Sequence, residues 1–224
     1  MSKPKVVIDF FYDVISPYSW VAFEALTRYR PKWDFVLKMK PCFLGGIMQG
    51  AGNSPPMTVP NKAMYAMTDL HRIRDYYKIP FQPVADPEQA ILRDNSLPTM
   101  RFLTALNGKR SDLMEDASRA FWMRRYNQDT SIVKPEDMKE VSRLIKLPDA
   151  ESDEIIELIK SQAIKDQLKQ TTEEALQLQA FGVPWIVLNK DGKQECYFGS
   201  DRFHLIAYAL GKEFPGPCAE NAKL

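Results

Sequence analysis

The segment FYDVISPYSW, residues 11–20, leads from an apolar run into a helix through a serine followed by a proline. Serine is a favoured N-cap, and proline fits the first helical turn because its missing N–H would have no partner there. The β-branched and aromatic residues 6–14 predict a strand before the serine. Residues 17–30 carry apolar side chains with the spacing of a helix that packs on a sheet. We therefore expect a strand, a turn and a helix, with Ser16 at the amino end of that helix.

The same segment holds two serines, Ser16 and Ser19, at the spacing of the cysteines in a C-x-x-C redox motif. Capping alone would explain Ser16, and Tyr18 and Trp20 would then be aromatic residues of the core or of a dimer contact. A second interpretation uses the same geometry. A hydroxyl beside the free N–H groups and the positive dipole end of a helix can stabilise an anion.

The two ends of the chain together predict one sheet. Residues 34–43 alternate and indicate a second strand, which the helical crossover would place parallel to the first. Residues 183–199 indicate two strands joined by an Asp-Gly turn. A final helix is expected over residues 200–211, with Ser200 as its N-cap and Gly211 as its stop.

The middle of the chain predicts helices. Residues 44–61, dense in glycine and proline, indicate a long loop of a kind that is often functional. From about residue 61 to residue 180 the apolar spacing is helical and no strand is indicated. The predicted helices are residues 62–77, 97–107, 112–127, 135–145 and 163–180. The expected fold is therefore α/β: a β-α-β unit and a β-β-α unit form a mixed four-stranded sheet, interrupted by an all-helical insertion.

Composition narrows the function classes. The 224 residues are 45% hydrophobic and 26% charged, which suits one large domain or two intimate ones. The net charge of +1 favours neither nucleic acid nor an anionic membrane as partner, and no apolar run is long enough for membrane insertion. The amino end lacks a secretory apolar region, so secretion is not expected. The chain has neither metal-ligand spacing nor a G-x-S-x-G motif, so neither a metal site nor a serine hydrolase is expected. The cysteines and histidines are Cys42, Cys196, Cys218, His71 and His204.

Three motifs together resemble a kappa-class glutathione transferase: SPYSW at 16–20, FGVP at 181–184 and FGSDR at 198–202. The similarity extends along the chain through GNSPP, MRFLTA, FWM and LKQTTEEA. It implies a thioredoxin-like fold with an inserted helical domain, as in periplasmic disulfide oxidoreductases. The implied domains are a thioredoxin-like glutathione-binding domain, residues 1–60 and 178–224, and a helical domain, residues 61–177.

The resemblance implies that glutathione is a co-substrate, that no cofactor is needed, and that Ser16 activates the glutathione thiol. A glutathione-like thiol has a pKa of about 8.5, and lowering it by about two units needs about 2.7 kcal/mol. A hydrogen bond to a charged group supplies roughly 1.5–3 kcal/mol and a helix N-terminus roughly 0.3–1 more. The hydroxyl of Ser16 is therefore sufficient without a general base. The thiolate would be conjugated to hydrophobic electrophilic small molecules, with peroxidase activity left open.

The remaining site residues also come from the resemblance. Val183, before a cis Pro184, would pair with the cysteinyl backbone of glutathione, and Ser200 and Asp201 would receive its γ-glutamyl end. Arg202 would contribute there or form a solvated or inter-subunit salt bridge. The other implied glutathione contacts are Pro17, Tyr18, Asn53 and Lys62, and the expected apolar lining for the electrophile is Trp20, Met48 and Trp185.

Two rival functions stay open. The 2-hydroxychromene-2-carboxylate isomerases resemble this family and share the S-P-Y-S start, and in them a glutathione thiolate adds and leaves again. A non-catalytic chaperone or assembly module on a thioredoxin-like scaffold is the rival of another class. A thiolate absorbance band on adding glutathione would speak against the module.

The carboxyl end, Ala222-Lys223-Leu224, resembles the S-K-L peroxisomal signal. A chance match of three residues is the competing explanation. The family association adds mitochondria as the alternative location, although no Arg- and Ser-rich transit segment is present. The family likeness also implies a homodimer.

Overall fold

A mixed four-stranded sheet forms the centre of the protein, in a computed structural model that describes residues 6–82 and 95–217. The strand order is β2-β1-β3-β4, with β1 and β2 parallel and the other neighbours antiparallel. The strands are β1 (Val6–Tyr12), β2 (Phe35–Pro41), β3 (Trp185–Lys190) and β4 (Lys193–Phe198). The predicted Asp-Gly turn is confirmed, since Asp191 and Gly192 have φ of 51° and 75°, as the tight turn between β3 and β4 requires.

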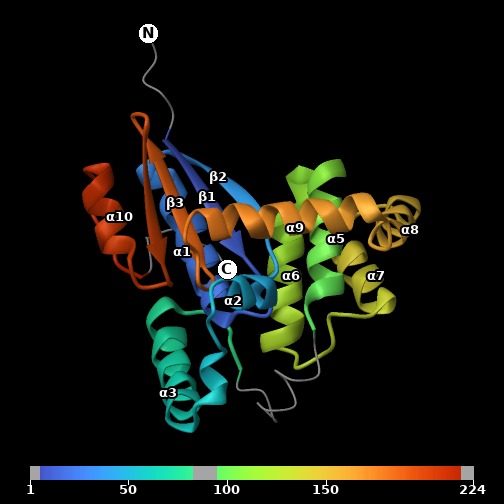
Figure 1. The fold of residues 1–224 in the computed structure, drawn as a ribbon, viewed down its shortest axis with the longest axis horizontal. Helices are drawn as coiled ribbons and strands as arrows, with labels where there is room; N and C mark the ends of the chain where they lie inside the picture. Colours follow the sequence, from blue (N-terminus) through green and yellow to red (C-terminus); the bar gives the residue numbers. More distant parts are fainter. Residues whose placement is uncertain (1–5, 83–94, 218–224) are drawn as a thin grey trace.

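Helices cover both faces of the sheet. Alternate residues of β1 point to opposite faces. Ile8 and Phe10 pack with α1 (Pro17–Trp33) and α10 (Phe203–Leu210), whereas Phe11 packs with residues of α2 and α9. α2 is Leu44–Gly50 and α9 is Gln162–Gln177. In Figure 1, α9 runs from the sheet to the other helices and so connects the two parts of the molecule.

The middle of the chain is helical, as expected. In Figure 1, α3 lies at the lower left, apart from α5–α8 on the right. The elements are η1 (Pro56–Thr58), α3 (Pro60–Tyr77), α5 (Leu97–Lys109), η2 (Ser111–Leu113), α6 (Met114–Tyr126), α7 (Pro135–Leu144) and α8 (Asp149–Leu158). The domain boundaries expected at residues 60/61 and 177/178 stay a prediction.

The loop expected over residues 44–61 is partly wrong, because α2 and η1 lie within it. Three glycines in α2 argue against a helix by propensity. Tertiary packing overrides them: a Cβ on Gly50 would lie 2.6 Å from a methyl carbon of Leu176 in α9. Glycine therefore lets α2 approach α9 closely, and this approach involves residues far apart in sequence. α8 was also not expected, because its buried Ile155 and Ile156 are adjacent and form no clear stripe.

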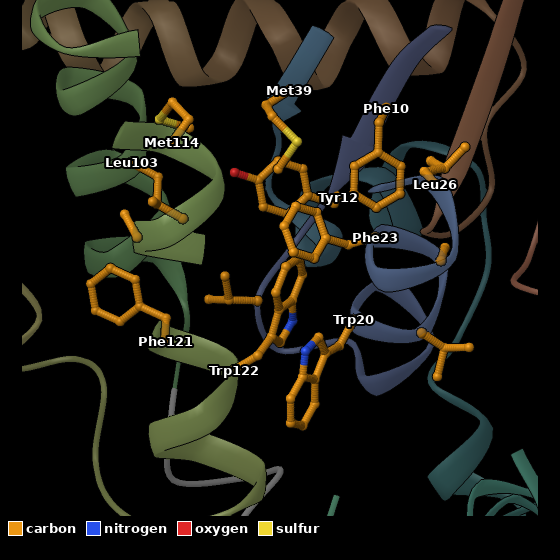
Figure 2. Packing of buried hydrophobic residues seen from close by; sticks show 14 of the residues in the cluster. Phe10, Tyr12, Trp20, Phe23, Leu26, Met39, Leu103, Met114, Phe121 and Trp122 are labelled. Atoms are coloured by element: carbon orange, nitrogen blue, oxygen red, sulfur yellow. The ribbon is translucent and has the colours of Figure 1, made fainter. Parts of the chain in front are cut away.

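One hydrophobic core continues from the sheet into the inserted helices, as Figure 2 shows. The ring of Trp122 on α6 lies 5.4 Å from that of Tyr12 and 5.2 Å from that of Phe23, measured between centroids. Tyr12 belongs to β1 and Phe23 to α1. The strand before Ser16 and the helix after it thus both pack against Trp122 of α6.

Candidate active site

Ser16 is the N-cap of α1, as predicted. Its side-chain oxygen accepts a hydrogen bond from the backbone N–H of Ser19 at 3.1 Å, and Pro17 is the first residue of the helix. Ser16 is 5% exposed. The hydroxyl therefore lies at the positive end of a 17-residue helix, in surroundings that largely exclude water.

A cis proline lies next to this serine, at the same end of the neighbouring strand β3. The Val183–Pro184 peptide bond is cis, as the family likeness implied, and the hydroxyl of Ser16 donates to the carbonyl of Val183 at 3.3 Å. The N–H of Gly199 donates to the carbonyl of Pro184 at 3.0 Å. These two hydrogen bonds therefore connect three segments that are distant in sequence, at residues 16–20, 181–184 and 198–202.

The expectation that Ser200 caps the last helix is wrong. α10 begins at Phe203, and the N-cap position is Arg202, whose side chain makes no capping hydrogen bond. Gly199 has φ of 93°, and its N–H is hydrogen-bonded to Pro184. The helix therefore begins later in the chain than the sequence predicts. Ser200 is buried, and its carbonyl accepts from the hydroxyl of Tyr77 at 3.5 Å.

Asp201 and Arg202 form an exposed ion pair at 2.7 Å. Exposed pairs of this kind contribute at most about 1 kcal/mol to stability, so both side chains can turn to a ligand at little cost. The prediction that the last helix ends at Gly211 is confirmed, since this residue is the C-cap of α10 with φ of 67°.

Tyr18 is held by a carboxylate that the sequence did not single out. Its hydroxyl donates to Asp69 of α3 at 3.0 Å. Burial, together with the negative charges of Asp69 and Asp201, raises the pKa of Tyr18, so its hydroxyl remains a donor at neutral pH. Burial similarly raises the pKa of Tyr77 to about 12. Asp69 and Tyr77 are polar residues on a helix whose packing against α1 the sequence could not show.

Asn53 and Lys62 lie at the edge of this region. The amide of Asn53 donates to the carbonyl of Phe181 at 2.7 Å, which brings the segment after α2 to the cis-proline segment. Lys62 lies exposed in the first turn of α3 and, within the described part of the chain, makes no hydrogen bond or ion pair with the other site residues. Asn53 is therefore adjacent to the site, whereas Lys62 does not contact it directly. The residues that the structure brings together are Ser16, Tyr18, Val183, Pro184, Ser200, Asp201 and Arg202.

Comparison with known proteins identifies the family of this site. The DsbA-like thioredoxin domain matches residues 7–211. Human glutathione S-transferase kappa 1 is 38% identical over 219 residues, which cover 97% of each chain. The chain belongs to the kappa class of glutathione transferases. The resemblance of SPYSW, FGVP and FGSDR to that class is thereby confirmed.

The kappa-class chain also has more distant relatives. The 2-hydroxychromene-2-carboxylate isomerase of Sphingobium xenophagum is 24% identical over 202 residues, covering 89% of this chain and 95% of the other. A solved structure of a 2-hydroxychromene-2-carboxylate isomerase superposes with a TM-score of 0.73 at 19% identity, covering 92% of this chain and 94% of the other. That superposition confirms the thioredoxin-like fold with inserted helices.

The apolar lining expected for this kappa-class protein needs a correction. Trp20 is 1% exposed, its indole N–H donates to Glu24, and its ring packs on Tyr126, so it belongs to the core. Trp185, the expected lining residue beside the cis proline, is 6% exposed and packs with Phe181 and Phe198 in an aromatic cluster that is defined here by these three residues. The ring centroids of Phe181 and Phe198 are 4.4 Å apart, and these two residues are 42% and 41% exposed. Met48 is half-buried, on α2.

Asp13, three residues before Ser16 in this kappa-class chain, carries a buried carboxyl group. Burial raises the pKa of Asp13 to about 6, and hydrogen bonds from Ile15, Leu44 and Ser96 partly oppose this rise. Asp13 is therefore largely ionised at neutral pH.

Burial also raises the pKa of Cys42 well above its usual value, so this thiol is inert. Cys196 is the exposed cysteine of the described chain. Cys218 lies outside the described residues.

The arrangement can stabilise an anion through one hydroxyl and a helix N-terminus, and it holds no thiol at either position of the S-x-x-S pair. Among residues 6–82 and 95–217, no group of three or more His, Cys, Asp or Glu side chains is placed to hold a metal ion. None of the helices in these same ranges has the length and apolar character needed to span a bilayer.

Proposed function

We propose that this protein is a glutathione transferase that conjugates the glutathione thiolate, stabilised by Ser16, to hydrophobic electrophiles. The observation that carries the proposal is the position of the Ser16 hydroxyl, at the start of α1 and 3.3 Å from the carbonyl of Val183. A peptide that pairs with the backbone of Val183 would place its cysteine sulfur against this hydroxyl.

The surrounding charges suit the two ends of glutathione. The carboxylates of Asp69 and Asp201 lie close enough to Tyr18 to raise its pKa, and they suit the ammonium group of a γ-glutamyl end. Lys62 and Asn53 are the proposed partners of the glycine carboxylate. Arg202 is paired with Asp201, and we propose that it turns toward the ligand when glutathione binds.

The electrophile would pack on the aromatic cluster. Phe181 and Phe198 present exposed rings next to the cis-proline segment, and apolar contact with such rings is tolerant of ligand shape. Peroxidase activity toward organic hydroperoxides stays open, because it would use the same thiolate.

The isomerase is the second candidate, since a relative of that name is 24% identical to this chain. The first step, addition of a stabilised thiolate, would be the same in both. The chaperone alternative has less support, because 38% identity over nearly the whole chain links it to a glutathione transferase.

We also propose a homodimer, as the likeness to the kappa class implies. Peroxisomal location is proposed from Ala222-Lys223-Leu224, with mitochondria as the alternative. These last residues lie outside the described part of the chain.

The test is a titration of the purified protein with glutathione, followed by ultraviolet absorbance. A thiolate band that appears at neutral pH on saturation supports the transferase and the isomerase and opposes the non-catalytic module. Assays with aryl halides, hydroperoxides and a chromene carboxylate then separate conjugation, peroxidase and isomerase activity. Binding without any thiolate band would overturn the proposed role of Ser16.

A further inference from the structure

The turn between β1 and α1 is held from behind by a completely buried carboxylate. The side chain of Asp13 is 0% exposed. One oxygen accepts from the backbone N–H of Ile15 at 3.0 Å, within the turn. The other accepts from the N–H of Leu44 and from the hydroxyl of Ser96, each at 2.9 Å. Asp13 thereby joins the turn to the start of α2 and to the residue that precedes α5.

A second buried group holds the opposite side of the same turn. The hydroxyl of Tyr126, on α6, donates to the carbonyl of Ile15, the residue directly before Ser16. The N–H of Ser16 donates to the backbone carbonyl of Asp13 at 3.0 Å. The N–H of Ile15 is therefore fixed by the side chain of Asp13, and its carbonyl by the side chain of Tyr126 from the inserted helices.

A buried charge at this position needs an explanation. Removing a carboxylate from water is costly, and its donors must offset the cost. Local turn formation alone does not require a charge, because an asparagine accepts the same backbone N–H in a comparable turn. An ionised carboxylate can accept from Ile15, Leu44 and Ser96 at once, whereas an asparagine amide presents its N–H₂ group to one side.

We propose that Asp13 is a positioning residue that, together with the Tyr126 hydroxyl, fixes the turn of residues 13–16 so that the Ser16 hydroxyl meets the glutathione sulfur. This inference rests on the proposed function. A hydrogen bond to a thiolate depends steeply on distance and angle. Release of either buried group lets the turn shift, and Ser16 then stabilises the thiolate less well.

The experiment measures the pKa of the bound glutathione thiol by absorbance in the wild type, in Asp13→Asn, in Ser16→Ala and in the double variant. We expect Asp13→Asn to raise this pKa by about one unit, with kcat at neutral pH about tenfold lower and KM for glutathione within about threefold. In the Ser16→Ala background, Asp13→Asn should add no further rise, because it acts through the serine. An equal rise in both backgrounds, or no rise in either, overturns the proposal.

Asp137→Asn is the matched control. Asp137 is also buried and accepts from a backbone N–H, that of Lys134, and from Arg124. It lies on α7, among the inserted helices. Loss of stability without a change in the thiol pKa is expected for this variant. A thiol pKa that rises equally in Asp137→Asn would show a general loss of packing and would overturn the specific role of Asp13.

If Asp13→Asn does not fold, Tyr126→Phe carries the test. It removes one hydroxyl and keeps the ring, and a rise in thiol pKa that disappears in the Ser16→Ala background is again expected. An unchanged thiol pKa in Tyr126→Phe then overturns the proposal. The failure of the proposed function looks different, because in that case the wild type itself shows no thiolate band that depends on Ser16.

Discussion

Replacing Ser16 by alanine tests the central hydrogen bond of the site. Ser16 is 5% exposed, so its bond to a bound thiolate would be poorly screened by solvent. A hydrogen bond to a charged group contributes roughly 1.5–3 kcal/mol, and each 1.36 kcal/mol corresponds to one pH unit. The pKa of the bound thiol should therefore rise by about one to two units. Glutathione affinity should stay within about tenfold, because the proposed contacts of Val183 and of the two charged ends would still hold the rest of the peptide.

The same substitution also removes an N-cap, and this effect needs a control. Loss of the bond from Ser19 should lower the free energy of unfolding by about 0.5–2 kcal/mol. Ser161 caps α9 in the same way, accepting from the N–H of Ile164 at 3.3 Å, at the end of α9 near α8. Ser161→Ala should cause a similar loss of stability with no change in thiol pKa. The reasoning is refuted if the pH–rate profile and the thiolate titration of Ser16→Ala match those of the wild type.

Three further predictions address charge, sorting and redox chemistry. Because burial raises the folded-state pKa of Asp13 from 3.8 to about 6, its carboxyl group stabilises the fold most below pH 4, and this contribution is lost as the pH rises through 6. The stability of the wild type relative to Asp13→Asn, measured by urea unfolding, should thus fall by about 2 kcal/mol between pH 4 and pH 7, and a flat difference would contradict the burial argument. Deleting Ala222 to Leu224 should leave activity and Tm unchanged but abolish peroxisomal import in cells, and retained import would place the signal elsewhere. In Ser16→Cys the new thiolate should attack oxidised glutathione, form a mixed disulfide and release one glutathione thiolate, and the adduct should persist because Ser19 cannot resolve it. Mass spectrometry decides this, and modification of Cys196 with residue 16 untouched would contradict the shared geometry.

Local chemistry made part of this site predictable. The strand, the serine cap and the proline at the first helical position follow from residues adjacent in sequence, and β1, Ser16 and α1 appear as expected. The Asp-Gly turn is local in the same sense. One mixed four-stranded sheet was predicted from the strands indicated at the two ends of the chain, whereas the strand order β2-β1-β3-β4 was not.

The remaining contacts depend on tertiary packing. The bond from Tyr18 to Asp69 spans 51 residues and exists because α3 packs on α1. α2 was unexpected because its glycines lower helix propensity, and the packing of α2 on α9 that offsets this joins residues far apart in sequence. The displaced start of α10 depends on a bond between Gly199 and Pro184, which no helix signal in SDRF could reveal. Propensity is a weak prior in each case, and packing decides.

The position of Ser16 is set by the buried contacts of the core that joins the sheet to the inserted helices. Tyr126, which holds the carbonyl before Ser16, lies one helical turn beyond Trp122, whose ring packs on β1 and α1 (Figure 2). Asp13 ties the same turn to the beginnings of α2 and α5. In the proposed reaction the site supplies one hydroxyl and takes its nucleophile from the substrate, so no second catalytic group would compensate for misplacement. Its chemistry therefore depends on how rigidly these buried contacts orient that hydroxyl.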